Sequence, residues 1–446
     1  MKKTLQILQD FSIPLIAGVV VAMIIANMNP EFYTALIKVS VADLWALFTS
    51  AEFDKTAGIE AAETGWRHYT SLHFLANDIV MAFFFGIAAK EITEACLPNG
   101  ALNPVSKAVN PLFGTMGGVL GPVGVFLALN AVAGETAWKK GWGIPTATDI
   151  ALAWLVARLI FGSGHSAVSF LLLLAVADDA IGLGIIALGY PDPEHPTVWS
   201  NLVWLIPAMG IAFGLRLLKV KSWIPYIVVG GALSWWGLYT AHLHPALALV
   251  FIVPFLPGPK KDLGLFVESV DFGEQVNAHG HLHEHSPLEN FEHHMKLVID
   301  FGLFFFALAN AGVPFSEVNG LTWILLSALL VGKTVGIVGF SWLAVQLGFP
   351  LPAGMQMRHL LVTGLIAALG LTVALFVSEQ AFVDATLRGA AKMGAVLSAV
   401  AAVIAWGTAR VLGIRPVGAG EGLFAAEQAG KADGSDSASA SETTSV

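Results

Sequence analysis

Long apolar segments recur along this chain, and they constrain its fold more than any other feature. An α-helix needs about 20 mostly apolar residues to cross the hydrocarbon of a bilayer. Apolar segments close to this length are predicted near residues 11–28, 72–89, 111–133, 144–161, 167–190, 198–217, 223–240, 243–257, 297–313, 321–347, 359–378 and 389–412. In lipid every backbone polar group must be paired within the protein. The sequence therefore predicts an all-α polytopic membrane protein with about twelve transmembrane helices.

Composition excludes several other classes of protein. Only 12% of the 446 residues are charged, 56% are hydrophobic and the mean hydropathy is +0.71, which excludes a soluble enzyme, a disordered chain and a fibrous one. The net charge of −9 leaves no basic stripe for nucleic acid. The single cysteine, Cys96, excludes a disulfide framework and a cysteine-based metal cluster.

The positions of the basic residues predict the orientation of the chain. If the N-terminus lies inside, the inside segments hold fifteen Lys and Arg residues and the outside segments hold seven. This excess is typical of cytoplasmic segments, so both termini are expected in the cytoplasm. Residues 1–415 form the expected transmembrane domain, in which 29–70 are a periplasmic loop and 258–296 a cytoplasmic loop. The Gly-, Ala-, Ser-, Glu- and Thr-rich residues 416–446 are expected to be a disordered cytoplasmic tail.

Histidines gather in the predicted cytoplasmic loop. Its segment HGHLHEHSPLENFEHH (279–294) holds six of the thirteen histidines of the chain. A cytoplasmic pH sensor or a metal sink is one interpretation, because imidazole titrates near neutral pH and binds Zn²⁺. A solvated, flexible His-rich loop is the alternative, and composition favours it.

Five ionisable residues are predicted at the middle of apolar segments, where each requires a partner or a function. They are Asp78, Asp149, Asp178, Asp179 and Lys333. Asp179 is the thirteenth of the 24 residues of its segment, and Lys333 is the thirteenth of 27, so both are expected near the centre of the bilayer.

Asp178 and Asp179 predict the chemistry of the site. Two adjacent carboxylates that are partly desolvated do not both stay ionised without a nearby cation. Such a pair can hold protons in one state and a hard cation such as Na⁺ or Li⁺ in another, and Lys333 can neutralise one carboxylate when the cation leaves. A static Lys–Asp pair that holds helices in register is the alternative, but it requires only one carboxylate per ammonium.

Two apolar segments carry residues that favour an interrupted helix. Asp149 follows Gly143, Pro145 and Thr148 in the segment 144–161, and Gly370 and Thr372 lie in the middle of 359–378. Pro and Gly mark points where a membrane helix can break, and a break exposes a helix N-terminus that stabilises a carboxylate. Breaks at corresponding positions in two halves of a transporter indicate its binding site.

Six strings of residues, taken in this order, resemble the bacterial NhaA-type Na⁺/H⁺ antiporter family over roughly residues 1–415. They are ANDIVMAFFFGIAAKEI (76–92), IPTATDIALAW (144–154), LAVADDAIG (174–182), FALANAGVPF (306–315), LVGKTVGI (330–337) and ALGLTVALF (368–376). The resemblance implies inverted repeats, two interrupted helices that cross, and a secondary antiporter rather than an enzyme. It also implies a bacterial inner membrane location, a role in sodium and pH homeostasis, and a homodimer.

The resemblance also implies roles for individual residues. Asp179 would bind Na⁺ or Li⁺ and carry protons, Asp178 would pair with Lys333 when no cation is bound, and Thr148 would line the site. Asp149 and Lys333 would compensate charge at the interrupted helices, supported by Asp78, Gly370 and Thr372. Two protons would enter for each Na⁺ exported, which makes the exchange electrogenic and requires no cofactor.

Residues that sense pH are less clearly indicated. Lys90 and Glu91 lie in GIAAKEITE (86–94), where Ala88 replaces a glutamate common in the family, so alkaline activation is one hypothesis. His244 is interpreted first as an interfacial hydrogen-bonding residue and second as a pH sensor. An intramembrane aspartyl protease is disfavoured because its two carboxylates must face each other across a substrate. A cation channel is disfavoured because no repeated pore element is evident.

Overall fold

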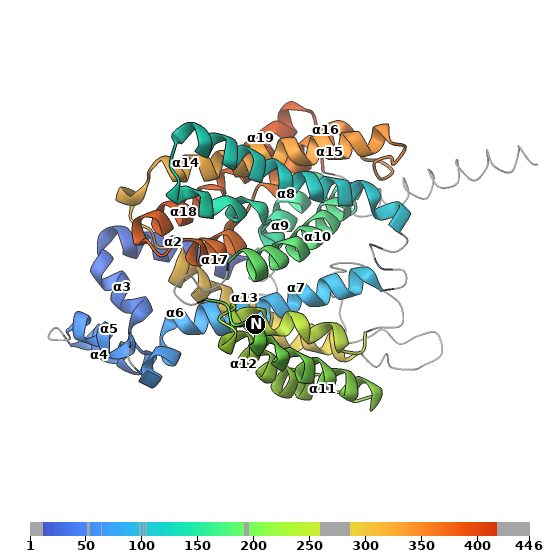
Figure 1. Cartoon of the computed structure of the whole chain (residues 1–446). Helices are drawn as coiled ribbons and strands as arrows, with labels where there is room; N and C mark the ends of the chain where they lie inside the picture. Colours follow the sequence, from blue (N-terminus) through green and yellow to red (C-terminus); the bar gives the residue numbers. More distant parts are fainter. Residues whose placement is uncertain are drawn as a thin grey trace, which may run out of the picture.

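The described part of the chain is entirely helical apart from one isolated bridge between Ser40 and Ser71. The structure is a computed structural model that describes residues 12–416 except 51–53, 64, 98–99, 101, 103–104, 191–195 and 259–285. Residues 417–446 of the predicted tail and most of the His-rich loop 258–296 therefore lie outside the described residues. Figure 1 shows the helices packed side by side as a bundle, with α3 (Pro30–Lys38), α4 (Leu44–Thr49) and α5 (Lys55–Glu63) at one end.

Six helices are long and apolar enough to cross a membrane, within the ranges that the structure describes. They are Leu72–Cys96 (α6 Leu72–Phe74, η3 Leu75–Val80 and α7 Met81–Cys96), Ala108–Ala133 (in α8, Val105–Ala133), Ser166–Gly189 (α10), Trp199–Leu217 (η5 Trp199–Trp204 and α11 Leu205–Leu217), Gly320–Gln346 (α14 Gly320–Ser327, η10 Ala328–Lys333 and α15 Thr334–Gln346) and Ala385–Val411 (α18 Ala385–Leu397 and α19 Val400–Val411). Two bent pairs bring the number to eight, namely η4 (Ala137–Thr146) with α9 (Ile150–Phe161), and α16 (Met357–Ala367) with α17 (Leu371–Ala381). The multi-pass helical class is thus established, at a coarser level than the twelve predicted spans.

The remaining apolar elements are shorter or less uniform. They are α2 (Ile13–Met28), η6 (Tyr226–Gly231) with α12 (Ala232–Thr240), η7 (Pro245–Phe251) with η8 (Val253–Phe255), and α13 (Pro287–Asn310). The predicted loop 258–296 ends earlier than expected, because α13 begins at Pro287 rather than near 297. Ser286 caps α13 by accepting a hydrogen bond from the Glu289 N–H, and the Glu289 side chain accepts one from the Ser286 N–H. This capping box starts the helix about ten residues before the apolar pattern.

Short helices occupy the predicted loop 29–70. They are α3 (Pro30–Lys38), η1 (Val41–Asp43), α4 (Leu44–Thr49), α5 (Lys55–Glu63) and η2 (Gly65–Thr70). Tyr33 of α3 joins this region to α13, since its hydroxyl donates to the Leu308 carbonyl at 2.8 Å. Burial raises the pKa of Tyr33 well above its ordinary value, which keeps the hydroxyl protonated as a donor.

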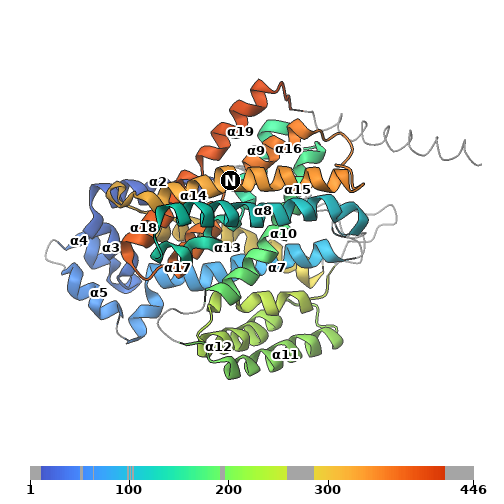
Figure 2. The same cartoon turned by 45° about the horizontal axis from the view of Figure 1, so that its top comes forward.

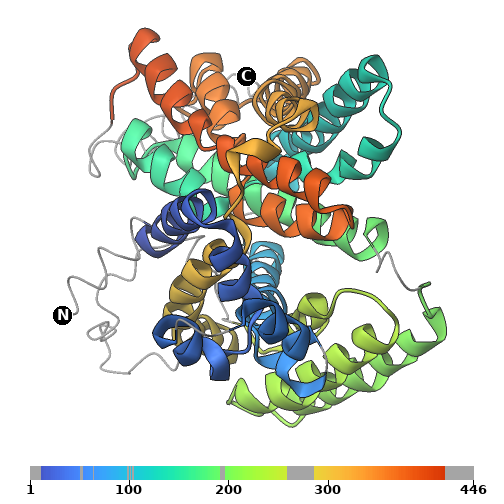
Figure 3. The same ribbon diagram turned by 90° about the vertical axis from the view of Figure 1, so that its left-hand side faces the viewer.

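The helices form two groups, which Figure 3 shows one above the other. Group I contains α8, η4, α9, α10, α14, η10, α15, α16, α17, α18 and α19, and group II contains α2, α6, η3, α7, α11, η6, α12, η7, η8 and α13. Within group I, α8 packs along α15, as Figure 2 also shows, and within group II α13 packs along α2. The boundary between the groups is formed mainly where α10 and α17 face α7 and α13.

Glycines allow α8 and α15 to approach closely. A Cβ added to Gly117 would overlap the backbone carbonyl of Gly336, and one added to Gly121 would overlap that of Gly332. Small residues at a helix crossing let backbones meet in membrane proteins, where lipid gives helices little hydrophobic reason to associate. This crossing fixes the position of η10 (Ala328–Lys333) along the axis of α8, and Lys333 is the last residue of η10.

Candidate cation and proton site

Two bent helix pairs meet inside group I. Helix η4 ends at Thr146 and α9 begins at Ile150 after a bend of 49°, while α16 ends at Ala367 and α17 begins at Leu371 after a bend of 45°. The two breaks contact each other directly. The Asp149 N–H donates to the Leu369 carbonyl at 2.7 Å, and the Thr148 hydroxyl donates to the Ala367 carbonyl at 3.1 Å. Backbone groups that lost their helical partners are therefore paired across the breaks.

Asp149 lies at the N-termini of both outgoing helices. Its carboxylate accepts a hydrogen bond from the Leu152 N–H of α9 at 3.1 Å and another from the Thr372 N–H of α17 at 3.2 Å. Asp149 is only 2% exposed, so this negative charge is buried. Free N–H groups at a helix N-terminus carry partial positive charge and stabilise a carboxylate there. Two such termini compensate Asp149 without a basic side chain.

Lys333 compensates the opposite kind of helix end. Its ammonium donates to the carbonyl of Thr146, the last residue of η4, at 2.5 Å. Carbonyls at a helix C-terminus carry partial negative charge and favour a cation. Lys333 is fully buried and ends the π-helical segment η10, a distortion that is frequent at functional sites.

The adjacent aspartates of α10 have different surroundings. Asp178 is fully buried, and its Oδ2 atom accepts hydrogen bonds from the Lys333 ammonium at 2.6 Å and from the Thr148 hydroxyl at 2.8 Å. Asp179 instead lines a small cavity with Phe85, Ala88, Leu183, Ile186 and Val373. These lining residues come from α7, α10 and α17, so the cavity lies at the boundary between groups I and II.

The charges of the site do not balance when all its acids are ionised. Helix N-termini compensate Asp149 and Lys333 compensates Asp178, whereas no basic side chain in the described residues pairs with Asp179. Oδ1 of Asp178 and Oδ1 of Asp179 also have no hydrogen-bond partner in the described part of the chain. The arrangement thus offers carboxylate and hydroxyl oxygens plus one excess negative charge. It can accept a proton or a hard monovalent cation.

The structure therefore brings six predicted site residues together, namely Thr148, Asp149, Asp178, Asp179, Lys333 and Thr372. Gly370 lies beside them, directly before the first residue of α17. Asp78 is not among these contacts. It lies in the π-helical segment η3 (Leu75–Val80) and is the seventh residue of the helix Leu72–Cys96. Its position at mid-span and its supporting role stay predictions.

Lys90 and Glu91 form part of a second cluster, separate from the aspartates. Lys90 pairs with Glu94 at 2.7 Å, with Glu292 of α13 at 2.5 Å and with Glu91 at 3.7 Å. Sequence analysis did not include Glu94 and Glu292 among the site residues. The early start of α13 brings Glu292 to α7, and the sequence pattern had assigned that residue to a loop.

His244 takes part in a contact between the two groups. Its Nδ1 atom accepts a hydrogen bond from the Ala246 N–H at 3.2 Å, which caps η7. Its ring packs edge-on against Phe376 of α17, with ring centroids 4.6 Å apart. Phe376 also contacts Phe85 of α7, with centroids 5.1 Å apart.

Comparison with known proteins places this geometry in a family. The sequence model of the family described as Na⁺/H⁺ antiporter 1 matches residues 2–409. The chain is 54% identical to Na(+)/H(+) antiporter NhaA 2 of Pelobacter propionicus over 94% of its length and 100% of that protein. It is 53% identical to Na(+)/H(+) antiporter NhaA of Desulfitobacterium hafniense over 93% of this chain and 98% of the relative. The antiporter of that name from Jannaschia sp. is 40% identical over 88% of this chain.

These matches cover nearly the whole chain, including both bent helix pairs and the aspartates of α10. They establish a secondary transporter rather than an enzyme, embedded in a membrane by several helices. The chain belongs to the NhaA family of Na⁺/H⁺ antiporters.

Proposed function

We propose that the protein is an electrogenic antiporter that exports Na⁺ or Li⁺ in exchange for protons, and that Asp178 and Asp179 bind both ions in turn. The unbalanced charge at Asp179 is the observation that supports this proposal most. A site with one excess carboxylate binds either a proton or a cation, because a buried negative charge without a partner costs several kcal/mol of free energy.

The proposed cycle depends on Lys333. In the fully protonated state both aspartates are neutral. Once Asp178 has lost its proton and before a cation binds, Lys333 and Thr148 hold its carboxylate, as in the present conformation. When protons leave toward the cytoplasm, Na⁺ binds between the two carboxylates and weakens the bond from Lys333 to Asp178. On the other side of the membrane, protons displace Na⁺. Exchange is obligatory because the two ions compete for the same oxygens.

The stoichiometry follows from the number of carboxyl groups. If both aspartates are protonated in one state and share one Na⁺ in the other, two protons exchange for one sodium ion. Each cycle then moves one net charge. The membrane potential of a bacterial cell, negative inside, would drive Na⁺ export by this stoichiometry.

The location and topology are part of the proposal. The excess of basic residues in the inside segments supports cytoplasmic termini. We infer a bacterial inner membrane protein with twelve spans arranged as inverted repeats, in which the bent pairs 137–161 and 357–381 are the two interrupted, crossing spans. A homodimer in the lipid bilayer and a role in sodium and pH homeostasis are also proposed.

Everted membrane vesicles test the proposed function. A pH-sensitive dye reports collapse of ΔpH when Na⁺, Li⁺ or K⁺ is added between about pH 6.5 and 9, a range chosen to bracket neutral pH. Asp179→Asn is expected to abolish the Na⁺ and Li⁺ responses. Asp384→Asn is the matched control, because Asp384 is an exposed N-cap of α18 and Asn caps a helix equally well.

The outcome of this assay is decisive in either direction. Loss of exchange in Asp179→Asn, with normal insertion and an active Asp384→Asn control, supports the proposal. Near-normal exchange in Asp179→Asn contradicts it.

A further inference from the structure

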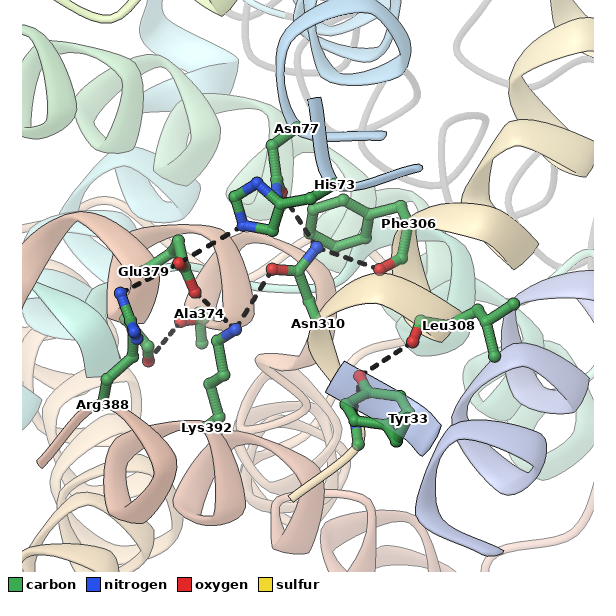
Figure 4. A network of polar contacts seen from close by, with 12 residues as sticks. Tyr33, His73, Asn77, Phe306, Leu308, Asn310, Ala374, Glu379, Arg388 and Lys392 are labelled. Atoms are coloured by element: carbon green, nitrogen blue, oxygen red, sulfur yellow. Dashed lines mark hydrogen bonds and ion pairs between the residues drawn. The ribbon is translucent and has the colours of Figure 1, made fainter. Parts of the chain in front are cut away.

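A second buried ion network surrounds Glu379, away from the aspartates of α10. Glu379 lies in the last turns of α17 and pairs with two basic residues of α18, Arg388 at 3.1 Å and Lys392 at 2.5 Å. Its side chain is only 12% exposed. Figure 4 shows Arg388 and Lys392 converging on the carboxylate. These ion pairs lie entirely within group I.

Two further contacts join this network to group II. His73 of α6 lies with its Nε2 atom 3.4 Å from Oε1 of Glu379. Lys392 donates to Oδ1 of Asn310 in α13 at 3.3 Å, and Nδ2 of Asn310 donates to Oδ1 of Asn77 at 2.9 Å. The dashed lines in Figure 4 run from α17 and α18 across to α6 and α13.

The network lies beyond the aspartate site along α17. Helix α17 carries Thr372 at the site, then Val373 in the cavity, then Phe376, then Glu379. At about 1.5 Å per residue, Glu379 lies about 10 Å beyond Thr372 along the axis. Between them the rings of Phe85, Phe376 and His244 pack together across the group boundary.

Breaking the contacts between the groups leaves each side with satisfied charges. If groups I and II separate at this end, Glu379 keeps both Arg388 and Lys392. Asn310 keeps Asn77 and the Phe306 carbonyl. A buried charge left without a partner is costly, but this separation strands none among these residues. The contacts between groups I and II can therefore break at a low cost in free energy, unlike a static buried ion pair.

We propose that Glu379, His73, Lys392 and Asn310 form a gate that closes the side of the membrane bearing residues 29–70. This proposal rests on the proposed antiport function, because alternating access requires each side to open in turn. In the present conformation the gate is closed, and the packed rings of Phe85, Phe376 and His244 separate it from the aspartates. Outward release of the cation requires the His73–Glu379 and Lys392–Asn310 contacts to break. Glu379 is thus a further residue that determines the exchange, although it touches no transported ion.

Thiol labelling measures the opening of the gate independently of transport. Cys96 is the single cysteine, so Cys96→Ser provides a background without thiols. Ile186→Cys then places one thiol in the Asp179 cavity, about two turns beyond Asp179 along α10. In intact cells, a membrane-impermeant maleimide reaches this thiol only when the gate opens. Purified protein is checked for folding by size-exclusion chromatography in detergent.

Two variants should open the gate, and one should not. His73→Ala removes only a contact between the groups, and Glu379→Gln removes the charge that holds the network. Loss of a hydrogen bond of ordinary strength is expected to raise the labelling rate roughly three- to tenfold. Arg388→Gln is the matched control, since Arg388 pairs with Glu379 inside group I alone. Its labelling rate should stay near that of the parent.

The results distinguish the gate from the proposed function. Unchanged labelling in folded His73→Ala and Glu379→Gln, or an equal rise in Arg388→Gln, overturns the gate. A second variant, His73→Cys with Glu379→Cys, is joined by a bifunctional, reducible thiol reagent. Exchange should then stop, and a reductant should restore it. If Asp179→Asn retains exchange while labelling responds as predicted, the ion mechanism fails and the gate stands.

Discussion

Replacing Lys333 by methionine provides the sharpest test of the charge balance at the site. Methionine fills a similar volume but donates no hydrogen bond and carries no charge. The change removes the 2.6 Å bond to Asp178 and the bond to the Thr146 carbonyl, and it leaves a fully buried carboxylate with only Thr148 as a donor. Removing one partner of a buried pair costs about 3–5 kcal/mol.

The expected thermal effect follows from that cost. With an unfolding entropy of about 2 cal/mol/K per residue over roughly 400 ordered residues, ~4 kcal/mol lowers the apparent Tm by about 5 °C. The Tm is measured in detergent by fluorescence-detected size-exclusion chromatography. The double variant Lys333→Met with Asp178→Asn should recover most of the loss, because a neutral amide replaces the unpaired carboxylate.

Sodium should act more strongly on the single variant than on the wild-type protein. A bound Na⁺ supplies the positive charge that Lys333 no longer provides, and a ligand that binds only the folded state stabilises it. We therefore expect a larger rise in Tm with NaCl for Lys333→Met than for wild type, with choline chloride as the ionic-strength control. A Tm equal to that of wild type in Lys333→Met, or no recovery in the double variant, refutes this reasoning.

Three further predictions use purified protein and are measured by Tm or by the yield of folded protein. Asp149→Ala should lower the free energy of unfolding by about 2–4 kcal/mol, since it removes the acceptor for the N–H groups of Leu152 and Thr372. Asp149→Asn keeps one acceptor oxygen and should cost less. An equal loss of stability in the two variants contradicts the capping role. Gly336→Ala should prevent α8 and α15 from packing and sharply reduce folded yield, whereas Gly339→Ala, with open space around its Cα, should not. Burial lowers the pKa of His165, whose Nδ1 atom accepts the Ala167 N–H, so the folded state favours neutral imidazole. The stabilisation from neutral His165 should be complete well above the unfolded pKa of about 6.5 and should fall as the pH drops below that value. His165→Asn should therefore have a flatter profile of Tm against pH between about pH 7.5 and 5.5. An unchanged slope excludes His165 as the source of the pH dependence.

Much of the helical fold follows directly from hydropathy, because spanning segments must be apolar and helical in lipid. Exceptions occur where polar residues extend a helix beyond its apolar part. Helix α13 begins at Pro287 through the Ser286 capping box, a local signal that an apolar window does not detect.

The candidate site was predictable to the extent that charges inside apolar segments are expensive. Asp149, Asp178, Asp179 and Lys333 were found in this way, and the structure brings them together. The pairing of Asp149 with the N–H of Thr372 depends on two breaks meeting in space, which one segment alone does not encode. The Glu379 network was missed because its members lie near the ends of four helices, where charged residues are ordinary.

Competition between Na⁺ and protons for Asp178 and Asp179 is the central claim, and proton release on sodium binding measures it most directly. Purified protein in detergent is titrated with NaCl by calorimetry in two buffers of different ionisation enthalpy, from about pH 6 to 9, a range that brackets neutral pH. The account predicts release of protons on binding, a Na⁺ dissociation constant that rises as the pH falls, and loss of both effects in Asp179→Asn. Sodium binding with no proton release and with an affinity independent of pH would contradict the account.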